Sequence, residues 1–418
     1  MAQLTDDCFA FGGPLLPIDE VERLIGERVT PVAETETVAL KDARSRVLAS
    51  DVIAPIDLPP FDNSAVDGYA VRHADLGAAT ETKLAIVDRL TAGRKTARAV
   101  GAGEAIRIFT GAPMPQGADT VFMQEDVRLE GAAVIVPAGL KRGANRRLAG
   151  EDVARGSVAL PAGRRLQPQD LSMAAALGLQ RLPVRRRVCV AIFSTGDEIV
   201  EPGTPLPAAG LYDANRALLR GLLARLDAAV TDLGILRDDP ERLAARLAEA
   251  ANGHDLVLTS GGVSTGEADF VRDAIAAAGT LVFWRVAIKP GRPVAMGVLR
   301  GTAFVGLPGN PVAVFVTFAR VVRPLLLRLA GAAPEPLIAL PVASGFAYRK
   351  KKGRREYVRV SLTRRADGTY EAHKHPQDGA GVISSLTATD GLAELADDVT
   401  EIAPGTMIGF LPYSVLAG

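Results

Sequence analysis

Hydrophobic and polar positions follow two different periods along this chain of 418 residues. Between residues 186 and 330, short apolar runs such as Val188–Phe193 and Leu256–Thr259 alternate with stretches in which apolar residues recur every three or four positions. The runs predict buried strands, and the stretches predict helices, for example from Asp213 to Leu226. This alternation indicates a parallel sheet covered by helices on both faces. The expected fold class is α/β and multidomain, with a central doubly wound α/β domain.

The rest of the chain has other patterns. Helical spacing recurs near residues 18–25, 40–49 and 166–179, whereas short β-like runs separated by glycines dominate residues 54–151 and the C-terminal part. These differences predict four domains, which are an α/β N-terminal linking domain (1–53 with 152–185), a small β-rich inserted domain (54–151), the α/β domain (186–330) and a C-terminal β-barrel-like domain (331–418).

Charge and cysteine content limit the classes of function. Lys plus Arg and Asp plus Glu both number 48, which argues against bulk binding to nucleic acid or to a membrane surface. Three consecutive arginines, Arg185–Arg187, are expected to be the solvated entry to a strand. Only Cys8 and Cys189 are present, and the four histidines lack metal-ligand spacing, so neither a disulfide framework nor a Cys-rich zinc site is expected. Because no signal-peptide pattern and no membrane-spanning apolar run is found, the expected compartment is the cytoplasm.

A glycine-rich loop follows the predicted strand Leu256–Thr259. Its residues Ser260, Gly261, Gly262 and Ser264 lead into a helical pattern, so backbone N–H groups would face a ligand at the end of the strand, and a phosphate suits them. Glu267 and Asp269 lie at the same place and would repel a phosphate unless a divalent cation such as Mg²⁺ bridged the charges. The alternative interpretation is that both acids only stabilise the first turn of the helix.

Two further loops follow predicted strands. The prolines and glycine of Lys289–Pro293 hold Lys289 and Arg292 in a rigid turn, and Pro308 precedes Asn310, a good helix N-cap. Ligands of doubly wound sheets bind beyond the carboxyl ends of the strands. The residues that this rule places near one rim are Glu198, Asp213, Asn215, Asp238, Asp269 and Lys289. We interpret the loops as converging on one anionic, metal-dependent ligand.

The β-rich segment and the C-terminal segment contain further candidates. Asp67 lies in a turn rich in hydrogen-bond acceptors, which is either purely structural or part of a site. Thr110 follows a strand and is expected to be free to donate to an oxyanion, and Asp152 closes the segment. Arg354 lies in a basic run that is either a solvated turn or an anion contact.

Taken in chain order, seven segments resemble those of one known family. The segments are Asp62–Ala70, Thr110–Pro115, Gly150–Asp152, Ser194–Glu198, Ser260–Ser264, Lys289–Pro293 and Leu307–Pro311, and the resemblance as a whole covers nearly the whole chain. The family is molybdopterin molybdenumtransferase, the last enzyme of molybdenum cofactor synthesis, also represented by the C-terminal domain of gephyrin. The resemblance implies an elongated four-domain subunit and a homodimer, with the N-terminal linking domain taking part in dimerisation and the active site lying between partners. It also implies that molybdate, as substrate, is inserted into adenylylated molybdopterin with Mg²⁺-dependent release of AMP.

The resemblance also assigns roles to residues of this chain. The matching active-site positions are Asp67, Thr110, Asp152, Glu198, Asp238, Asp269 and Lys289. Glu198 and Asp269 would hold Mg²⁺, and Lys289 would offset charge on the leaving phosphate. Substrate contacts are expected from Thr110, Ser194, Thr195, Gly196, Asp213, Asn215, Ser260, Gly261, Gly262, Ser264, Arg285, Arg292, Pro308 and Arg354. Two departures stand out: Arg285 replaces a lysine, and Ala380 replaces a serine.

Alternative functions follow from parts of the same resemblance. Residues 186–330 resemble the stand-alone molybdopterin adenylyltransferase, which would consume ATP rather than release AMP. A non-catalytic binding scaffold of the gephyrin type is the other alternative, and it would tolerate loss of the acidic residues. For the leading interpretation, the adenylyltransferase and acceptor molybdoenzymes are candidate partners.

Overall fold

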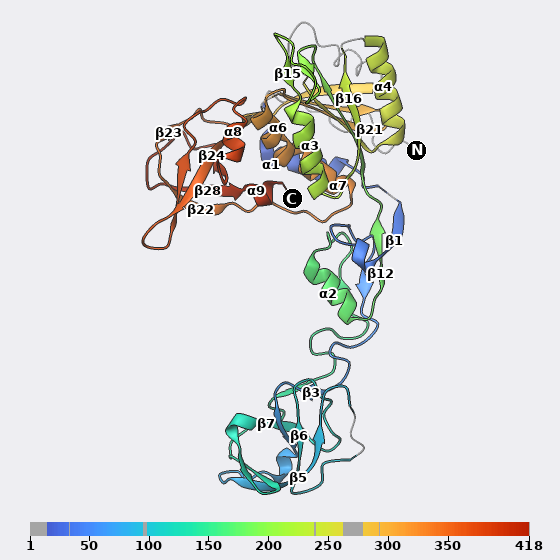
Figure 1. Ribbon diagram of the computed structural model, residues 1–418, viewed down its shortest axis with the longest axis vertical. Coiled ribbons are helices and arrows are strands. Elements are labelled where there is room, and N and C mark those ends of the chain that lie inside the picture. Colours follow the sequence, from blue (N-terminus) through green and yellow to red (C-terminus); the bar gives the residue numbers. More distant parts are fainter. Residues whose placement is uncertain are drawn as a thin grey trace.

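The computed structural model describes residues 15–32, 34–94, 98–237, 240–261, 279–291 and 293–417. Figure 1 shows an elongated molecule in which an upper lobe, a narrow waist and a lower β-rich domain follow one another. The upper lobe contains the α/β domain and, beside it, the C-terminal domain. Among the described residues, no helix is long and apolar enough to cross a membrane.

The α/β domain is built on a six-stranded sheet with the order β16-β13-β17-β21-β20-β18. The first four strands are parallel, but β20 is antiparallel to both of its neighbours, so the prediction of an all-parallel sheet was wrong at this edge. The reason is a tight hairpin between β20 and β21, in which Arg300 and Gly301 both have positive φ. The strands are β13 (Cys189–Thr195), β16 (Ala229–Leu236), β17 (Leu256–Ser260), β18 (Gly279–Arg285), β20 (Pro293–Leu299) and β21 (Thr302–Leu307).

Helices cover both faces of this sheet, as the sequence predicts. Successive side chains of β13 alternate between two cores, because Val190 and Ile192 belong to one buried cluster and Ala191 and Phe193 to the other. The helices of the lobe are α1 (Ile18–Arg28), α3 (Ala214–Arg225), α4 (Pro240–Gly253), α6 (Pro311–Thr317), the π-helix η4 (Phe318–Val322) and α7 (Arg323–Leu329). The same lobe also contains three short strands, β14 (Ile199–Val200), β15 (Leu211–Tyr212) and β19 (Ile288–Lys289).

Helix α1 belongs to the core of the upper lobe, although its residues lie in the predicted linking domain. Its buried residues Ile18, Val21, Leu24 and Ile25 recur at helical spacing, and the helix packs against α7. The apolar face of α1 therefore completes the α/β domain rather than the waist.

The waist has its own small core. It consists of β1 (Thr35–Ala39), η1 (Leu40–Asp42), β2 (Val52–Ile53), β11 (Val158–Leu160), α2 (Pro168–Ala176) and β12 (Arg181–Arg185), packed around a separate apolar cluster. The helix predicted near residues 40–49 is absent, because the chain forms only η1 there. Ser45 has a φ of 64°, which ends helical geometry.

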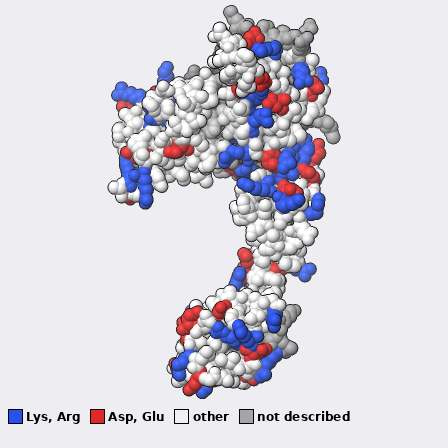
Figure 2. All heavy atoms as spheres, viewed as in Figure 1, with Lys and Arg blue, Asp and Glu red and all other residues white. Residues whose placement is uncertain are grey.

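Charged side chains of both signs gather where the waist meets the upper lobe (Figure 2). Arg186 forms an ion pair with Asp255 at 2.7 Å, and Arg187 forms one with Asp227 at 3.0 Å. These arginines of the run Arg185–Arg187 are therefore neutralised within the chain.

The lower domain and the C-terminal domain are both β-rich, as predicted. The lower domain has a six-stranded sheet with apolar clusters on both sides, and its elements are β3 (Asn63–Ser64), β4 (Gly68–Val71), η2 (His73–Asp75), β5 (Thr82–Leu90), β6 (Glu104–Ile108), β7 (Thr120–Met123), η3 (Gln124–Asp126), β8 (Arg128–Glu130), β9 (Ala133–Val136) and β10 (Arg146–Arg147). The C-terminal strands close into a barrel through the pairing of β24 with β26. Its elements are β22 (Leu340–Ser344), β23 (Tyr348–Arg349), β24 (Arg355–Arg364), β25 (Tyr370–Lys374), α8 (Ser384–Thr387), β26 (Gly391–Leu395), β27 (Glu401–Ile402), β28 (Met407–Pro412) and α9 (Tyr413–Leu416).

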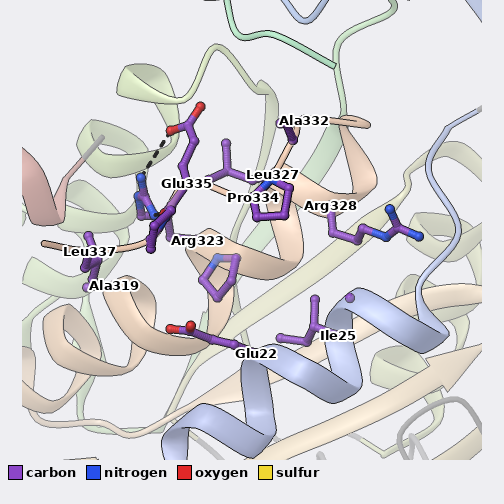
Figure 3. A pocket seen from close by; sticks show the side chains of 14 residues that line it. Glu22, Ile25, Ala319, Arg323, Leu327, Arg328, Ala332, Pro334, Glu335 and Leu337 are labelled. Atoms are coloured by element: carbon purple, nitrogen blue, oxygen red, sulfur yellow. Dashed lines mark hydrogen bonds and ion pairs between the residues drawn. The ribbon is translucent and has the colours of Figure 1, made fainter. Parts of the chain in front are cut away.

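Residues 332–337 connect α7 to the barrel and line a cavity of about 220 Å³ beside α1 (Figure 3). The carboxylate of Glu335 contacts Arg165 of the waist at 2.8 Å and Arg323 of α7 at 3.2 Å. Both arginine side chains are at least nine-tenths buried. One carboxylate therefore joins the waist, α7 and the connection to the barrel.

We predict that Glu335→Gln destabilises the upper lobe by about 1–3 kcal/mol, because two buried guanidinium groups lose their shared negative partner while water still reaches part of the site. Urea unfolding followed by the fluorescence of Trp284, the only tryptophan, measures the change. The control is Glu401→Gln, whose partner Arg349 is exposed, with an expected change of about 0.5 kcal/mol or less. Equal effects of the two substitutions would contradict the role given to Glu335.

Candidate functional site

Polar side chains gather at the carboxyl ends of the parallel strands, where the sequence placed them. Ser194 and Thr195 end β13 and Ser260 ends β17, and the two strands pair directly, with Ser194 opposite Ser260. All three residues are buried. The hydroxyls of Ser194 and Thr195 have no hydrogen-bond partner among the described residues. These hydroxyls are therefore available as donors at the rim of the sheet.

Two glycines allow the loops at this rim to approach closely. Gly261 has a φ of 87°, and a side chain there would come within 2.9 Å of the Thr195 carbonyl oxygen. A side chain at Gly196 would come within 2.7 Å of a carboxylate oxygen of Glu198. Glycine is favoured at Gly261 by its positive φ and by the fixed backbone of Thr195, and at Gly196 by a φ of 130°, since the Glu198 side chain could move aside.

Asn215 connects the rim to the next loop. Its Nδ2 donates to Ser260 Oγ at 2.8 Å and to the Gly309 carbonyl at 2.6 Å, while its Oδ1 has no partner among the described residues. Asp213 has a local task, since its side chain caps α3 by accepting from the Arg216 N–H at 3.0 Å. The other oxygen of Asp213 forms an ion pair with Arg216 at 3.2 Å, whereas Asn215 Oδ1 has no partner among the described residues.

A cavity of about 420 Å³ opens beside this rim, between the α/β domain and the barrel. Residues predicted as part of the site, Lys289 and Pro308, line it together with Asn310. Asn310 and Pro311 occupy the N-cap and first helical positions of α6, as expected, although the Asn310 side chain makes no capping hydrogen bond. The barrel contributes the opposite wall through Tyr348, Glu356, Tyr357, Val358, Arg359, Asp378 and Ala380.

Lys289 is held by a buried carboxylate of the barrel. Its Nζ lies 3.2 Å from Glu356 Oε2 and 3.3 Å from the Tyr348 hydroxyl, and Glu356 is 1% exposed. Burial opposes ionisation of Glu356, but hydrogen bonds from Tyr348, Arg354 and Lys289 outweigh it and lower its pKa. Burial likewise opposes the Lys289 cation, yet contacts with Tyr348 and Glu356 raise its pKa above the usual value. The pair therefore stays charged through the neutral range.

The structure brings into this cavity an arginine that the sequence interpretation missed. Arg359 is 5% exposed, and its guanidinium donates to Ser385 Oγ at 3.0 Å and to the carbonyls of Gln377 and Gly379 at 3.1 Å each. Among the described residues it forms no ion pair with a carboxylate, and burial lowers its pKa. Arg354, predicted as the substrate contact, instead pairs with Glu356 at 2.6 Å. The available signal was an arginine within the apolar run Tyr357–Val360.

The departure at position 380 lies directly at this cavity. The Ala380 carbonyl accepts from the Val312 N–H at 3.0 Å, which fixes the barrel loop against the start of α6. Its methyl group lines the cavity where a serine would supply a hydroxyl.

The predicted site residues of the lower domain and near the waist lie far from this cavity. Asp67 and Thr110 belong to the lower domain, and the waist separates them from the upper lobe (Figure 1). Asp67 Oδ1 accepts from both the N–H and the hydroxyl of Thr110 at 2.8 Å, so Thr110 is engaged rather than free. These two hydrogen bonds, with a smaller contribution from the charge of Arg107, lower the Asp67 pKa. Asp152 is exposed near the waist, where its N–H donates to the Leu58 carbonyl at 3.0 Å.

Several predicted site residues lie outside the described part of the chain. They are Asp238, Gly262, Ser264, Asp269 and Arg292, and for Arg285 only the backbone is described, as the end of β18. Glu198 is described and exposed, and its carboxylate forms no hydrogen bond or ion pair with the described residues. Within the described ranges, no cluster of three or more potential metal ligands occurs.

The cavity in Figure 3 lacks all of the predicted site residues. Its most buried cation, Arg323, already faces Glu335. The cavity beside Lys289 is therefore the candidate site of the upper lobe.

Comparisons with known proteins cover nearly the whole chain. Family models match the MoeA N-terminal region (domain I and II) at residues 16–178, a probable molybdopterin binding domain at 191–328 and the MoeA C-terminal region (domain IV) at 341–413. The chain is 36% identical over 409 residues to the molybdopterin molybdenumtransferase of Haemophilus influenzae, covering 97% of this chain and 100% of the relative. It is 36% identical over 404 residues to molybdopterin molybdenumtransferase 2 of Mycobacterium tuberculosis, covering 94% and 98%. The crystal structure of a molybdopterin biosynthesis moeA protein from Pyrococcus horikoshii has a TM-score of 0.80 and 30% identity, covering 96% of this chain and 100% of that one.

We predict that Thr110→Val raises the Asp67 pKa toward the ordinary value of 3.8, because the hydroxyl donor is lost while the backbone donor remains. A carboxyl whose pKa is lowered by folding contributes stability above its unfolded pKa, and this is lost as the pH falls through the folded value. The stability difference between wild type and variant should therefore be full above about pH 4 and shrink at lower pH. Carboxyl NMR titration and acid unfolding measure both effects. An unchanged Asp67 titration in the variant would refute the hydrogen-bond explanation, and Asp67→Asn is the control without the titrating group.

Proposed function

Because the chain belongs to the molybdopterin molybdenumtransferase family, we propose that it inserts molybdate into adenylylated molybdopterin with Mg²⁺-dependent release of AMP. The observation that carries this proposal is the buried guanidinium of Arg359, which shares a cavity with Lys289 and has no carboxylate partner among the described residues. Burial of a cation is costly, and the charge of Asp378, which lines the same cavity without forming an ion pair with Arg359, does not outweigh the burial. An oxyanion in the cavity would supply the additional negative charge.

Each part of the upper site has a separate task in this proposal. Lys289, kept charged by Glu356, lies where it would offset the charge that builds on a departing phosphate. The free hydroxyls of Ser194 and Thr195 would donate to the nucleotide phosphates. Arg359 would bind molybdate or phosphate oxygens through its remaining N–H groups. This arrangement orients the phosphoanhydride and stabilises the leaving group without a covalent intermediate on the protein.

The residues fit a magnesium ion by the chemistry of their donors. Glu198 offers an exposed carboxylate without a partner among the described residues, and carboxylate oxygens are the ligands that Mg²⁺ prefers. We propose that Glu198 and Asp269 hold the ion. When bound, Mg²⁺ would neutralise the charge of the phosphoanhydride and so assist its cleavage.

The lower domain supports a homodimer in which each site draws on both subunits. Asp67, Thr110 and Asp152 cannot contact the Lys289 cavity of their own chain, because the waist lies between them. A two-fold dimer would place the lower domain of one subunit at the upper site of the other, and both sites would then be equivalent. There the three residues would contact pterin or molybdate. A cytoplasmic location and exchange with the adenylyltransferase and acceptor molybdoenzymes complete the proposal.

We predict AMP release when the protein, adenylylated molybdopterin, Mg²⁺ and molybdate are combined under anoxic conditions, and no release when either Mg²⁺ or molybdate is omitted. Chromatographic quantification of AMP measures the reaction. Tight binding without release would overturn the proposal in favour of a scaffold, and consumption of ATP would indicate adenylyl transfer instead.

We predict that Asp67→Ala and Lys289→Gln are each inactive alone, because one removes a charged contact of the lower domain and the other removes the cation of the upper site. Asp269→Ala should likewise be inactive. Co-expression of the first two variants should restore about a quarter of wild-type activity, since about half the dimers are mixed and each contains one intact site. Reconstitution of an apo-molybdoenzyme is the assay. Purified mixed dimers without activity would contradict a site shared between subunits.

A further inference from the structure

Two arginines of the lower domain lie over aromatic rings next to the Asp67–Thr110 pair. The guanidinium carbon of Arg107 lies 4.9 Å from the centroid of the Tyr69 ring and 5.1 Å from that of Phe109. The guanidinium carbon of Arg89 lies 4.8 Å from the same Phe109 ring. Stacking of this kind fixes the plane of a guanidinium and leaves its N–H edges available to a ligand.

The sheet register explains why these side chains meet. Tyr69 of β4 lies opposite Arg107 of β6, and Arg107 lies opposite Arg89 of β5, so the three residues form a row across adjacent strands. Phe109 follows the end of β6, and Thr110 comes next. The row lines a shallow cavity of about 630 Å³. The two cations therefore lie on β5 and β6, close to the strand end that leads to Thr110.

Unlike most other arginines of residues 54–151, the two arginines of this row form no ion pair with the described residues. Other arginines of residues 54–151 lie within ion-pair distance of a carboxylate, namely Arg72, Arg98, Arg128, Arg142, Arg146 and Arg147. Arg89 and Arg107 form no such pair with the described residues. Arg107 donates to the neutral side chain of Gln124, and Asp88 accepts from the backbone N–H of Arg89 at 2.7 Å. Two carboxylates accompany the two arginines, because Asp67 lies nearby and Asp88 lines the same cavity.

We propose that Arg107 and Arg89 form an oxyanion-binding site for the reaction, next to Asp67 and Thr110. Two planar guanidinium groups held by one ring match the geometry of a phosphate-class anion, which each can bind through two N–H groups. The proposal rests on the proposed function and deepens it, because the phosphoanhydride of adenylylated molybdopterin and free molybdate both belong to this class of anion.

The test compares Arg107→Gln, Arg107→Lys and Arg89→Gln with the control Arg128→Gln in the full-length protein. Arg128 lies in the same domain but is exposed and paired with Glu81. Loss of a charge-assisted contact should raise KM about ten- to hundred-fold in Arg107→Gln and Arg89→Gln and leave kcat within about three-fold. Arg107→Lys should recover only part of the loss, because lysine keeps the charge without the planar fork. The control should match the wild type.

The KM of the variants for each substrate distinguishes the two possible anions. A higher KM for adenylylated molybdopterin alone assigns the site to its phosphate groups, and a higher KM for molybdate alone assigns it to molybdate. Arg89 is exposed, so Arg89→Gln tests the site even if Arg107→Gln perturbs the packing around Tyr69. Unchanged KM values for both substrates in Arg89→Gln and Arg107→Lys, with an active wild type, would overturn this inference alone. An inactive wild type would overturn the proposed function instead.

Discussion

The buried carboxylate of Glu356 holds the α/β domain and the C-terminal barrel together at the candidate site. It belongs to β24 of the barrel and accepts from Lys289 of the α/β domain, and β19 pairs with β24 at the same point. Tyr348 and Arg354 supply its other hydrogen bonds. A carboxylate this deeply buried stays ionised only when such partners surround it. The wall of the cavity and the position of its lysine therefore depend on one buried charge.

Buried charges of two kinds have different meanings in this molecule. Glu335 accepts from Arg165 and Arg323, and this cluster joins three parts of the chain through interactions that are already satisfied. Arg359 is about as buried as Arg323 but donates hydrogen bonds only to neutral oxygens. The Glu335 cluster stabilises the architecture, whereas Arg359 leaves a positive charge that an anionic ligand can neutralise.

The candidate chemistry is divided between the two ends of an elongated subunit. At the upper end, Lys289 and the loop that carries Pro308 line one cavity, and Asn215 links that loop to the hydroxyl of Ser260 at a strand end. At the lower end, Asp67 and Thr110 bind each other beside stacked arginines. Loops at the ends of rigid strands carry both groups, which is where binding residues are commonly found. The waist sets the distance between them and so requires a second subunit if both act on one substrate.

The sequence by itself determined the local elements and the residue types at the strand ends. Strand β13, helix α3 and helix α2 occur where hydrophobic periodicity predicted them, because the burial of one face is encoded in neighbouring positions. The helix predicted near residues 40–49 was wrong because the backbone of Ser45 and the contacts of the waist outweigh a local pattern. The antiparallel β20 depended on a hairpin that alternation alone does not reveal.

Only the tertiary structure decided which charges meet. Lys289 and Glu356 are 67 residues apart, and no local pattern relates them. The sequence also did not show which of two basic residues in one segment lines the cavity. Arg354 forms an ion pair with Glu356, and Arg359 lines the cavity. Sequence patterns specify which side chains are buried, but the pairing of buried charges follows from the packing of distant strands.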